Sequence, residues 1–425
     1  MNESSASQGR TFRLACAPEE VALADELLAA QGYTWVPEPF SALARRVVHE
    51  PAPLGSSLAA TFGLIYIQDK SSMLPPLVLG PTPGQPVLDI CASPGGKTSL
   101  LALLVGRDGF VLGNEPNRSR LETLRRNLHR MNAVSSATCC ESGEQLPLVE
   151  NSWPAILLDP PCSGWGTVDK NPGVMTIWRE EKTEPLIRLQ RELLTHASRL
   201  LAPGGALMYS TCTTNPKENE EQARFALDEL GLVLDPITPP AGFSADPTSI
   251  SGTEGVFRVD GRASDSQGFF LARFKKPGNP DDAVRPETAG LPGRPLSPAE
   301  RTACTEAGAN TDALPPGEMM RFKDNVFFVH EHARALLPGD LRWQGYLLGR
   351  FTGPQFRPHP RVRNLLPAHD RAPVLDTAEV AEIERLLTGQ SLPAPGKGKF
   401  AVLSFQGRAL ARLTIKGSRV LWSDK

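Results

Sequence analysis

Between residues 81 and 276, short apolar runs alternate with segments of helical periodicity, and this alternation constrains the fold more than any other feature of the sequence. The apolar runs that we interpret as strands are 86–90, 110–115, 155–159, 206–212 and 268–276. The segments with a helical spacing of apolar residues are 97–106, 117–133 and 184–201. Strands that alternate with helices in this way are typical of parallel βα units. The order therefore predicts a doubly wound α/β domain.

A chain of 425 residues needs more than one domain, since single hydrophobic cores stop growing near ~250 residues. We expect an N-terminal extension at 1–80, the α/β domain at 81–276, a proline-rich linker at 277–315 and a mostly β module at 316–425. The linker is predicted from six prolines between Pro277 and Pro298. Residues 1–10 are expected to be disordered, and 20–33 to form a helix.

From hydropathy and cysteine usage we expect a cytoplasmic protein. The chain has no run of eighteen apolar residues, and its first residues lack the apolar core of a secretory signal. Its seven cysteines are scattered and show no C-x-x-C spacing. We therefore expect free thiols, no disulfide framework, no metal site and no membrane contact.

The C-terminal part is basic although the whole chain has a net charge of −2. From Arg321 to the end, 17 Lys and Arg stand against 9 Asp and Glu. Such a module suggests a polyanionic partner, and the alternative is an uneven surface charge without function.

Two groups of arginines are candidates for contacts with RNA. In segment 349–364, arginines lie among Phe351 and Phe356, a mixture suited to phosphate pairing and base stacking, with a solvated loop as the alternative. The arginines of this segment are Arg350, Arg357, Arg361 and Arg363. Helix 117–133 also carries arginines, which we interpret as a solvated face in preference to an RNA contact. These are Arg118, Arg125, Arg126 and Arg130.

A glycine-containing loop joins the first predicted strand to the first predicted helix. The sequence LDICASPGGKTS at 88–99 makes this connection through Pro94-Gly95-Gly96, where an open α/β sheet binds nucleotide-like ligands. A phosphate-binding P-loop would need a glycine five residues before Gly96, where the chain has Cys91. The dinucleotide pattern G-x-G-x-x-G is also absent, so both of these common nucleotide sites are excluded.

Two carboxylates at strand ends indicate which ligand the loop holds. Asp89 ends the first strand, where it would repel a pyrophosphate but attract a cation such as the amino group of S-adenosylmethionine. Glu115 ends the second strand and is placed to accept hydrogen bonds from both ribose hydroxyls. With the glycine loop, they indicate an S-adenosylmethionine-dependent methyltransferase. The alternative is an ordinary tight turn between a strand and a helix.

Cysteines follow two later strands. Cys162 comes after one strand through Asp159-Pro160-Pro161, and Cys212 ends the next. If these strands are neighbours, as their single crossover helix suggests, both thiols flank one crevice at the sheet edge. A helix capped by Asn215, with Glu218 three residues later, is predicted to start just after Cys212 and to lower the pKa of its thiol.

A reactive thiolate in such a crevice suits methyl transfer to an unreactive ring carbon. Attack on C6 of cytosine makes C5 nucleophilic, so that C5 accepts a sulfonium methyl group before its proton and the thiolate leave. Asp159 would hold the base by its N3/N4 edge. Methylation of nitrogen needs no thiol, so the second cysteine favours carbon chemistry. We interpret Cys91, Cys139 and Cys140 as packing residues.

Several motifs, in their order along the chain, resemble the Nol/Nop/Sun family of RNA (cytosine-5) methyltransferases. They are YIQDKSSMLPP at 66–76, LDICASPGGKTS at 88–99, NEPN and an arginine at 114–120, ILLDPPCSGWGTVDKNP at 156–172, MYSTCTTNPKENE at 208–220 and GFFLARF at 268–274. The pair DPPCSG and STC…NE is the most specific. The basic module resembles the PUA-like appendage of the bacterial RsmF-like branch, which methylates small-subunit ribosomal RNA. The resemblance implies a Rossmann-like catalytic domain.

The resemblance also implies roles for the residues of the crevice. Cys212 is the nucleophile that attacks C6, and Cys162 assists proton removal and release of the enzyme. Asp159 lies between cofactor and base, and Lys97 contacts the target nucleotide or its phosphate.

The cofactor implied by the resemblance is S-adenosylmethionine. Glu115 takes its ribose, and Ser142 stands where the family usually has an aspartate at the adenine, with Glu141 as a substitute. The cradle consists of Cys91, Ala92, Ser93, Pro94, Gly95, Gly96 and Lys97.

The expected partner is ribosomal RNA, either free or within the small subunit, and the protein is expected to be a monomer. A first rival function is a ribosome-assembly factor that binds RNA without methylating it, against which Cys162 and Cys212 argue. A second is an amino-group RNA methyltransferase, which normally has an aromatic residue where Cys162 stands.

Overall fold

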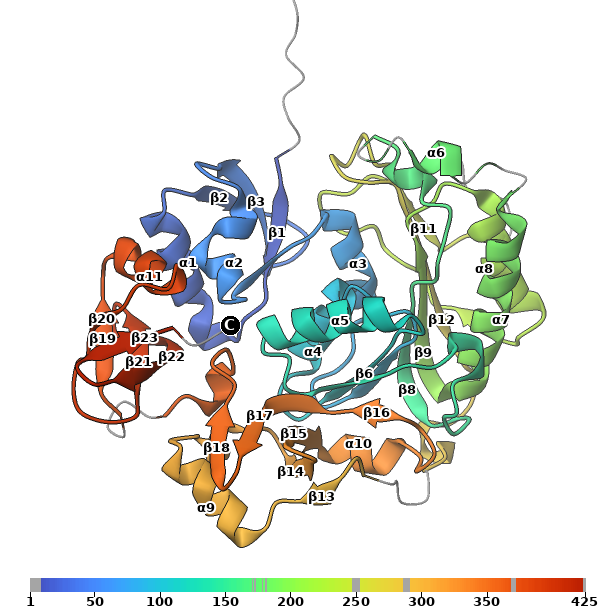
Figure 1. Cartoon of the computed structure of the whole chain (residues 1–425). Coiled ribbons are helices and arrows are strands. Elements are labelled where there is room, and N and C mark those ends of the chain that lie inside the picture. Colours follow the sequence, from blue (N-terminus) through green and yellow to red (C-terminus); the bar gives the residue numbers. More distant parts are fainter. Residues whose placement is uncertain are drawn as a thin grey trace, which may run out of the picture.

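A computed structural model describes residues 9–169, 171, 173–177, 179, 182–246, 253–285, 291–367 and 372–422. These residues form four β-sheets, which Figure 1 shows in colours that follow the sequence. The largest sheet contains the predicted parallel strands. The N-terminal sheet and two C-terminal sheets lie to its left and below it in this view.

The largest sheet is doubly wound, as predicted. Its parallel strands are β5 (Pro86–Asp89), β6 (Phe110–Asn114), β7 (Ser136–Cys139), β8 (Trp153–Leu158) and β9 (Leu201–Thr211). Its antiparallel strands are β10 (Val233–Leu234), β11 (Phe257–Val259), β12 (Phe269–Lys275) and β16 (Trp343–Gln344). The order is β10-β12-β9-β8-β5-β6-β7-β16. The chain therefore adds β6 and β7 on one side of β5 and then returns to add β8 and β9 on the other side. The β5–β8 boundary is the topological switch point, where such sheets bind ligands.

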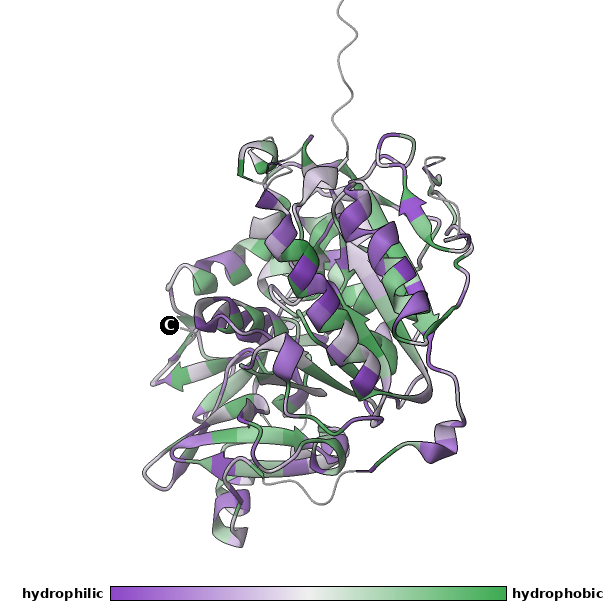
Figure 2. Cartoon of the chain, turned by 90° about the vertical axis from the view of Figure 1, so that its right-hand side faces the viewer, coloured by the Kyte–Doolittle hydropathy of each residue, from purple (hydrophilic) through white to green (hydrophobic). Residues whose placement is uncertain are grey.

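Helices cover both faces of this sheet. On one face lie α3 (Lys70–Leu79), α4 (Gly96–Val105) and α5 (Arg118–Arg130), and on the other α7 (Glu184–Leu200) and α8 (Glu220–Asp228). Leu101 and Leu124 pack in the first core, and Leu193 and Ala223 in the second. Figure 2 shows hydrophobic strands behind helices whose outer faces are hydrophilic. A short helix, α6 (Val174–Ile177), lies between β8 and α7.

The N-terminal extension forms a small sheet with two helices. Its strands, in the order β2-β3-β1-β4, are β1 (Thr11–Leu14), β2 (Thr34–Pro37), β3 (Ala44–His49) and β4 (Ile65–Ile67). The helices are α1 (Val21–Ala30), which lies inside the predicted segment 20–33, and α2 (Leu58–Thr61). Of the segment expected to be disordered, residues 1–8 lie outside the described residues.

The strands of the predicted module 316–425 do not form one sheet. They belong to two C-terminal sheets, apart from β16, which belongs to the central sheet. The first contains β13 (Arg294–Pro295), β14 (Gly317–Phe322), β15 (Asn325–His330), β17 (Tyr346–Thr352) and β18 (Gln355–Pro358), with α9 (Pro298–Glu306) and α10 (Glu331–Leu336) beside it. The second contains β19 (Val374–Thr377), β20 (Leu392–Pro393), β21 (Phe400–Phe405), β22 (Arg408–Lys416) and β23 (Arg419–Leu421), with α11 (Val380–Leu387). Buried side chains of the first sheet lie in its own core and in a core of the central sheet, whereas those of the second sheet lie in a third core.

The predicted linker 277–315 is partly folded into the first of these sheets. Strand β13 pairs with β14, and Leu296 and Cys304 are buried in the core of that sheet. Apolar side chains between the prolines are buried in this core. The proline content of the segment does not reveal this burial. Residues 286–290 lie outside the described part of the chain.

Both C-terminal sheets pack against earlier parts of the chain. Met320 and Val329 of the first C-terminal sheet share a core with Trp153 of the central sheet. Between β15 and β17, strand β16 joins the central sheet by pairing Trp343 with Cys139 of β7. The second C-terminal sheet shares a core with the N-terminal extension, in which Phe12 and Leu27 lie with Leu403 and Leu413. Figure 1 shows these red and blue elements side by side.

Among the described helices, none is long and apolar enough to cross a membrane.

Candidate active site

Three loops meet at the carboxyl ends of β5, β8 and β9. The loop after β5 is held to β8 by a hydrogen bond from Ile90 N to Leu157 O of 3.1 Å. The loop after β8 is held to β9 by a hydrogen bond from Gly166 N to Cys212 O of 3.0 Å. A side chain at Gly166 would come within 2.8 Å of that oxygen, so glycine permits this close approach. The predicted strand ends therefore form one site at the switch point.

The glycine loop after β5 turns through Gly95, whose φ of +104° favours glycine. Asn127 of α5 donates a hydrogen bond to Pro94 O at 2.8 Å and fixes the outer side of the turn. At Gly96 a Cβ atom would lie 2.8 Å from the Tyr66 ring, which covers the loop from the N-terminal extension.

The N-terminal extension also supplies a buried charge beneath this loop. The guanidinium of Arg13 in β1 donates to Gly96 O at 2.8 Å and to Ser99 Oγ at 2.5 Å. Burial lowers the pKa of Arg13 to about 10. This residue was not predicted from the sequence, although one arginine between Phe12 and Leu14 in an apolar strand indicates a buried charge.

Asp89 lies at the floor of the loop. Its Oδ2 accepts a hydrogen bond from Thr98 Oγ1 at 2.7 Å, and its Oδ1 is buried without a hydrogen-bond partner among the described residues. Burial raises the pKa of Asp89 to about 7. A buried carboxylate oxygen with no donor fits a ligand that brings a cationic group to this position.

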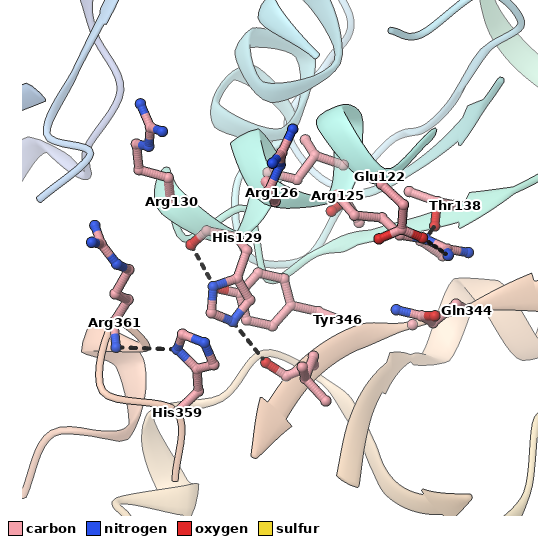
Figure 3. A pocket seen from close by; sticks show the side chains of 15 residues that line it. Glu122, Arg125, Arg126, His129, Arg130, Thr138, Gln344, Tyr346, His359 and Arg361 are labelled. Atoms are coloured by element: carbon pink, nitrogen blue, oxygen red, sulfur yellow. Dashed lines mark hydrogen bonds and ion pairs between the residues drawn. The ribbon is translucent and has the colours of Figure 1, made fainter. Parts of the chain in front are cut away.

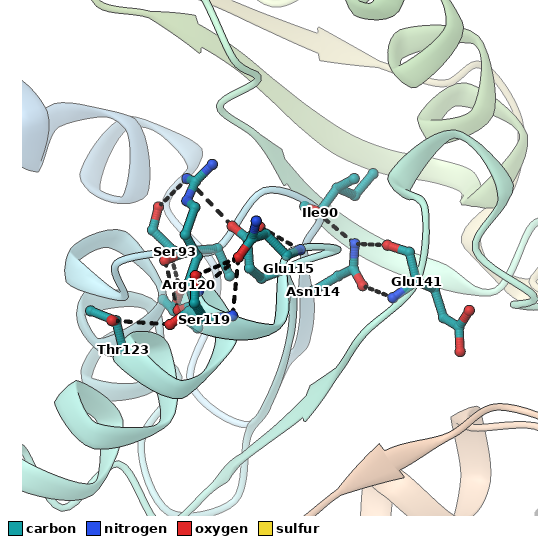
Figure 4. Close-up of polar contacts among 11 residues, drawn as sticks. Ile90, Ser93, Asn114, Glu115, Ser119, Arg120, Thr123 and Glu141 are labelled. Atoms are coloured by element: carbon teal, nitrogen blue, oxygen red, sulfur yellow. Dashed lines mark hydrogen bonds and ion pairs between the residues drawn. The ribbon is translucent and has the colours of Figure 1, made fainter.

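Glu115 lies at the end of β6, next to the glycine loop (Figure 4). Its carboxylate is buried and accepts a hydrogen bond from Asn117 N at 2.9 Å. Arg120 of α5 approaches the other oxygen at 3.3 Å and also donates to Ser93 O. The carboxylate is thus held at the sheet edge with acceptor capacity left for hydroxyl groups.

Asn114 joins the ends of three strands and was not identified from the sequence. Its amide nitrogen donates to Ile90 O at 3.1 Å and to Glu141 O at 3.0 Å, as Figure 4 shows. Ser142 is exposed beside Glu141, at the end of the same loop after β7. Both candidates for an adenine contact therefore lie near the glycine loop.

The remaining cradle residues differ in exposure. Ala92 is buried, Ser93 and Cys91 are half-buried and Pro94 is exposed. Burial raises the pKa of Cys91 well above its usual range, so this thiol stays protonated at neutral pH.

The two crevice cysteines are neighbours across parallel strands β8 and β9, as predicted. The Sγ atoms of Cys162 and Cys212 are 3.3 Å apart, and both thiols are free. The hydrogen bond between them lowers the pKa of Cys212 and raises that of Cys162. Lys97 adds a positive charge that also lowers the pKa of Cys212. Cys212 is therefore the better nucleophile of the pair.

The helix N-terminus predicted after Cys212, with Asn215 as its cap, is present only as a single turn. The turn after Cys212 is a short 3₁₀ helix, Pro216–Glu218, and α8 begins only at Glu220. Asn215 caps the short helix by accepting from Lys217 N, but Glu218 does not complete a capping box. A single 3₁₀ turn has too few aligned peptide dipoles to account for the shift.

Glu218 instead holds the two cysteine loops together. Its carboxylate is fully buried and accepts from Ser163 N at 3.0 Å, Ser163 Oγ at 2.6 Å, Gln190 Nε2 at 2.9 Å and Asn215 Nδ2 at 3.0 Å. Ser163 follows Cys162, and Asn215 follows Cys212 by three residues. The network therefore fixes the position of one thiol relative to the other.

Lys97 and Asp159 form an ion pair beside the thiols. Lys97 Nζ lies 2.7 Å from Asp159 Oδ2, and Ser210 Oγ donates to Asp159 Oδ1 at 2.8 Å. Burial opposes the charge of Lys97, but the Asp159 carboxylate outweighs it and raises the pKa of Lys97. The pair joins the glycine loop to the loop that carries Cys162.

The predicted RNA-contact segment 349–364 is mostly structural. Phe351 and Phe356 are buried in the core of the first C-terminal sheet, so they cannot stack on bases. Arg361 donates to Thr61 O at 2.6 Å, and Arg363 pairs with Glu20 at 2.6 Å, so both contact the N-terminal extension. The two others, Arg350 and Arg357, are exposed.

Comparison with known proteins identifies relatives of the chain. A family model described as 16S rRNA methyltransferase RsmB/F matches residues 76–275. Proteins named ribosomal RNA small subunit methyltransferase F are similar over longer stretches. The one from Klebsiella pneumoniae is 31% identical, covering 94% of this chain and 86% of its own. The one from Cronobacter sakazakii is 35% identical, but the alignment covers 64% of this chain and 57% of the relative.

Solved structures have the same fold in the catalytic part. A methyltransferase homologue from Pyrococcus horikoshii is 30% identical with a TM-score of 0.55, covering 63% of this chain and 86% of that one. NSun6 from the same organism, described with SFG, has a TM-score of 0.56 at 20% identity, covering 64% of this chain and 91% of that one. The latter likeness shows the fold alone.

Proposed function

Because the chain belongs to the RsmB/F family of 16S rRNA methyltransferases, we propose that it methylates C5 of a cytidine in small-subunit ribosomal RNA. The observation that carries this proposal is the pair of free thiols, 3.3 Å apart, at the ends of adjacent parallel strands. Methyl transfer to a ring carbon needs a nucleophile and a second group that takes part in proton transfer. One cysteine supplies each role.

In the proposed reaction, Cys212 attacks C6 of the cytosine as a thiolate. The electron pair that moves to C5 would take the methyl group that S-adenosylmethionine would supply from its sulfonium sulfur, with S-adenosylhomocysteine as the leaving group. The C5 proton passes to solvent with assistance from Cys162, the electron pair of the C5–H bond restores the C5–C6 double bond, and Cys212 leaves C6 as a thiolate. The lowered pKa of Cys212 and the raised pKa of Cys162 support this division of roles.

Asp159 and Lys97 are proposed to position the base. The Asp159 carboxylate accepts from the exocyclic amino group of cytosine, and its orientation is set by Lys97 at 2.7 Å and Ser210 at 2.8 Å. Lys97 contacts the nucleotide or its phosphate and keeps a positive charge near the Cys212 thiolate. Both residues lie between the glycine loop and the thiols.

The cofactor cradle is proposed from the chemistry of its donors and acceptors. The unpaired Oδ1 of Asp89 suits the cofactor's amino group, and Glu115 suits the ribose hydroxyls. The glycine loop from Cys91 to Lys97 lines the same side, and Ser142 or Glu141 contacts the adenine. SFG, named with the archaeal structure, is an analogue of S-adenosylmethionine.

For the rest of the chain, we propose a monomer in the cytoplasm with residues 81–276 as the catalytic unit. The basic C-terminal sheets are proposed to bind RNA in the manner of a PUA-like module. Exposed Arg350 and Arg357, paired across β17 and β18, support this role.

The decisive experiment measures tritium transfer from labelled S-adenosylmethionine to 16S rRNA and maps the methyl group by bisulfite sequencing. We expect incorporation that resists bisulfite conversion, and its loss in Cys212→Ser. Methyl groups found on a base nitrogen would support an amino-group methyltransferase. RNA binding without any incorporation would support an assembly factor.

A further inference from the structure

A groove runs along the outer side of α5, between the catalytic unit and strands β16 and β17. It consists of two cavities of about 470 Å³ and about 530 Å³. Both are lined by Glu122, Arg125, Gln344 and Gly345. Because the cavities share these residues, they form one continuous surface, here called the α5 groove.

The α5 groove concentrates positive charge in a chain whose net charge is −2. The arginines that line it are Arg118, Arg125, Arg126, Arg130, Arg342 and Arg361. Glu122 is the one acidic residue among the lining residues of the two cavities. Cations gathered in a groove attract an anion, because its walls exclude part of the screening solvent.

Three of these arginines form no side-chain ion pair or hydrogen bond within the described part of the chain. Arg125 pairs with Glu122 at 3.1 Å and donates to Thr138 Oγ1, so it is part of the wall. By contrast, Arg118, Arg130 and Arg342 are exposed, and their side chains form no ion pair or hydrogen bond with the described residues. Their guanidinium groups can therefore bind a ligand without breaking contacts.

Aromatic rings form the floor at one end of the α5 groove, as Figure 3 shows. The rings of His129 and Tyr346 are stacked with centroids 5.0 Å apart, and the His359 ring stands against His129 at 4.1 Å. Tyr346 Oη donates to His129 O at 3.1 Å, which fixes the floor. In Figure 3, Arg126, Arg130 and Arg361 lie around these rings.

The α5 groove leads towards the candidate active site. Arg130 is at the last residue of α5 and Arg118 at its first, a separation of about 20 Å for a helix of this length. Next to Arg118, Arg120 contacts the Glu115 carboxylate at 3.3 Å. One end of the groove thus lies beside the proposed cofactor cradle.

We propose that the α5 groove binds the phosphate backbone of the RNA segment that flanks the target cytidine. This inference rests on the proposed function for the identity of the polyanion. A small anion needs charges that converge on one point, whereas these arginines are spread along a helix, as a nucleic-acid backbone requires. The contacts are to phosphates and do not read the base sequence.

The test compares a triple variant, Arg118→Gln, Arg130→Gln and Arg342→Gln, with a matched control. The control, Arg188→Gln, Arg199→Gln and Arg224→Gln, removes three exposed arginines from α7 and α8 on the opposite face. The dissociation constant for in vitro transcribed 16S rRNA is measured over a range of salt concentrations. Far-ultraviolet circular dichroism and affinity for S-adenosylmethionine check that both variants are folded.

In the groove variant, we expect the dissociation constant to rise by about tenfold or more, and the slope of log K against log salt to fall by about 2. The control should change neither. Equal slopes and affinities in the two variants would overturn the proposal. Methyl transfer by the unaltered protein, measured in parallel, tests the proposed function separately. If the groove variant has a smaller salt slope but the unaltered protein transfers no methyl group, the groove proposal is supported and the proposed function is contradicted. If the unaltered protein transfers methyl groups but the groove variant keeps the salt slope of the control, the function is supported and the groove proposal is contradicted.

Discussion

Cys162 and Cys212 have opposite pKa shifts although both lie in one crevice. Their shared hydrogen bond, with the charge of Lys97, favours the thiolate at Cys212. Burial and the same hydrogen bond keep Cys162 protonated. The hydrogen bond between the two sulfur atoms thus makes Cys212 the nucleophile and leaves Cys162 for the later proton transfer.

Replacement of Cys162 by alanine should trap the covalent intermediate. If Cys162 takes part in the step that releases Cys212 from C6, we expect Cys162→Ala to accumulate an enzyme–RNA adduct. The adduct is measured as a slowly migrating band on a denaturing gel after incubation with 16S rRNA and S-adenosylmethionine.

A double variant, Cys162→Ala with Cys212→Ala, is the control and should give no band. Absence of the band in the single variant, with RNA and cofactor both bound, would contradict the assigned roles.

Asp89 should make cofactor binding depend on pH. Its pKa of about 7 in the folded chain is above the ordinary value, so the folded state binds an extra proton between about pH 4 and 7. The stability associated with that proton is complete below about pH 4 and is lost as the pH rises through 7. The ionised form attracts the cofactor's amino group, so its affinity should increase about five- to eightfold between about pH 6 and 7.5. Isothermal titration calorimetry measures this change.

The variant Asp89→Asn should bind the cofactor more weakly and with little dependence on pH over the same interval. A pH dependence unchanged in this variant would assign the titration to another group.

At the scale of elements, the loops after β8 and β9 depend on one buried carboxylate. Glu218 accepts hydrogen bonds from residues of both loops and of α7. Its position three residues after Asn215 contributed to the prediction of a helix start, but its side chain accepts a hydrogen bond from Ser163 of the loop after β8. The local sequence does not reveal these hydrogen-bond partners of Glu218, because the donors come from α7 and from the loop after β8.

Replacement of Glu218 should impair catalysis beyond its effect on folding. We expect Glu218→Ala to lose about 3 kcal/mol of stability, because it leaves buried donors unpaired. It should also lower kcat by about tenfold or more with little change in cofactor affinity, because the thiols lose their relative position. Urea denaturation and single-turnover methyl transfer measure the two effects.

Exposed Glu229, at the end of α8, offers the matched control Glu229→Gln, which should change neither quantity. A Glu218→Ala enzyme with lower stability but full kcat below its unfolding transition would show a purely structural role.

At the scale of the whole molecule, the N-terminal extension and the C-terminal segments are packed together. Phe12 and Leu27 share a core with Leu403 and Leu413 of the last sheet. Arg363 pairs with Glu20 at 2.6 Å and also donates to Phe62 O. The N-terminal and C-terminal segments therefore support each other, and through Arg13 they support the glycine loop.

Loss of the Arg363 contact should destabilise the folded chain. The side chain is 7% exposed and that of Glu20 26%, so we expect Arg363→Met to cost about 2 to 3 kcal/mol. Urea denaturation measures this cost, and a double-mutant cycle with Glu20→Gln isolates the pair. A coupling energy near zero would mean that the apolar core alone holds the two segments together.

The sequence by itself determined the doubly wound sheet, the strand ends and the residues placed there. Alternating periods of apolar residues are local signals, and parallel strands always present their carboxyl ends at one edge. For that reason the order of residues along the chain is enough to bring Asp89, Glu115, Cys162 and Cys212 near one crevice.

Only the tertiary structure decided how distant segments cover that sheet. The role of Arg13, the addition of β16 to β7 and the α5 groove all depend on contacts between residues more than 80 positions apart. Periodicity records which face of an element is apolar but not which other element covers it. The physical reason is that a side chain becomes buried only when another element packs over it, and that element can come from a distant part of the chain.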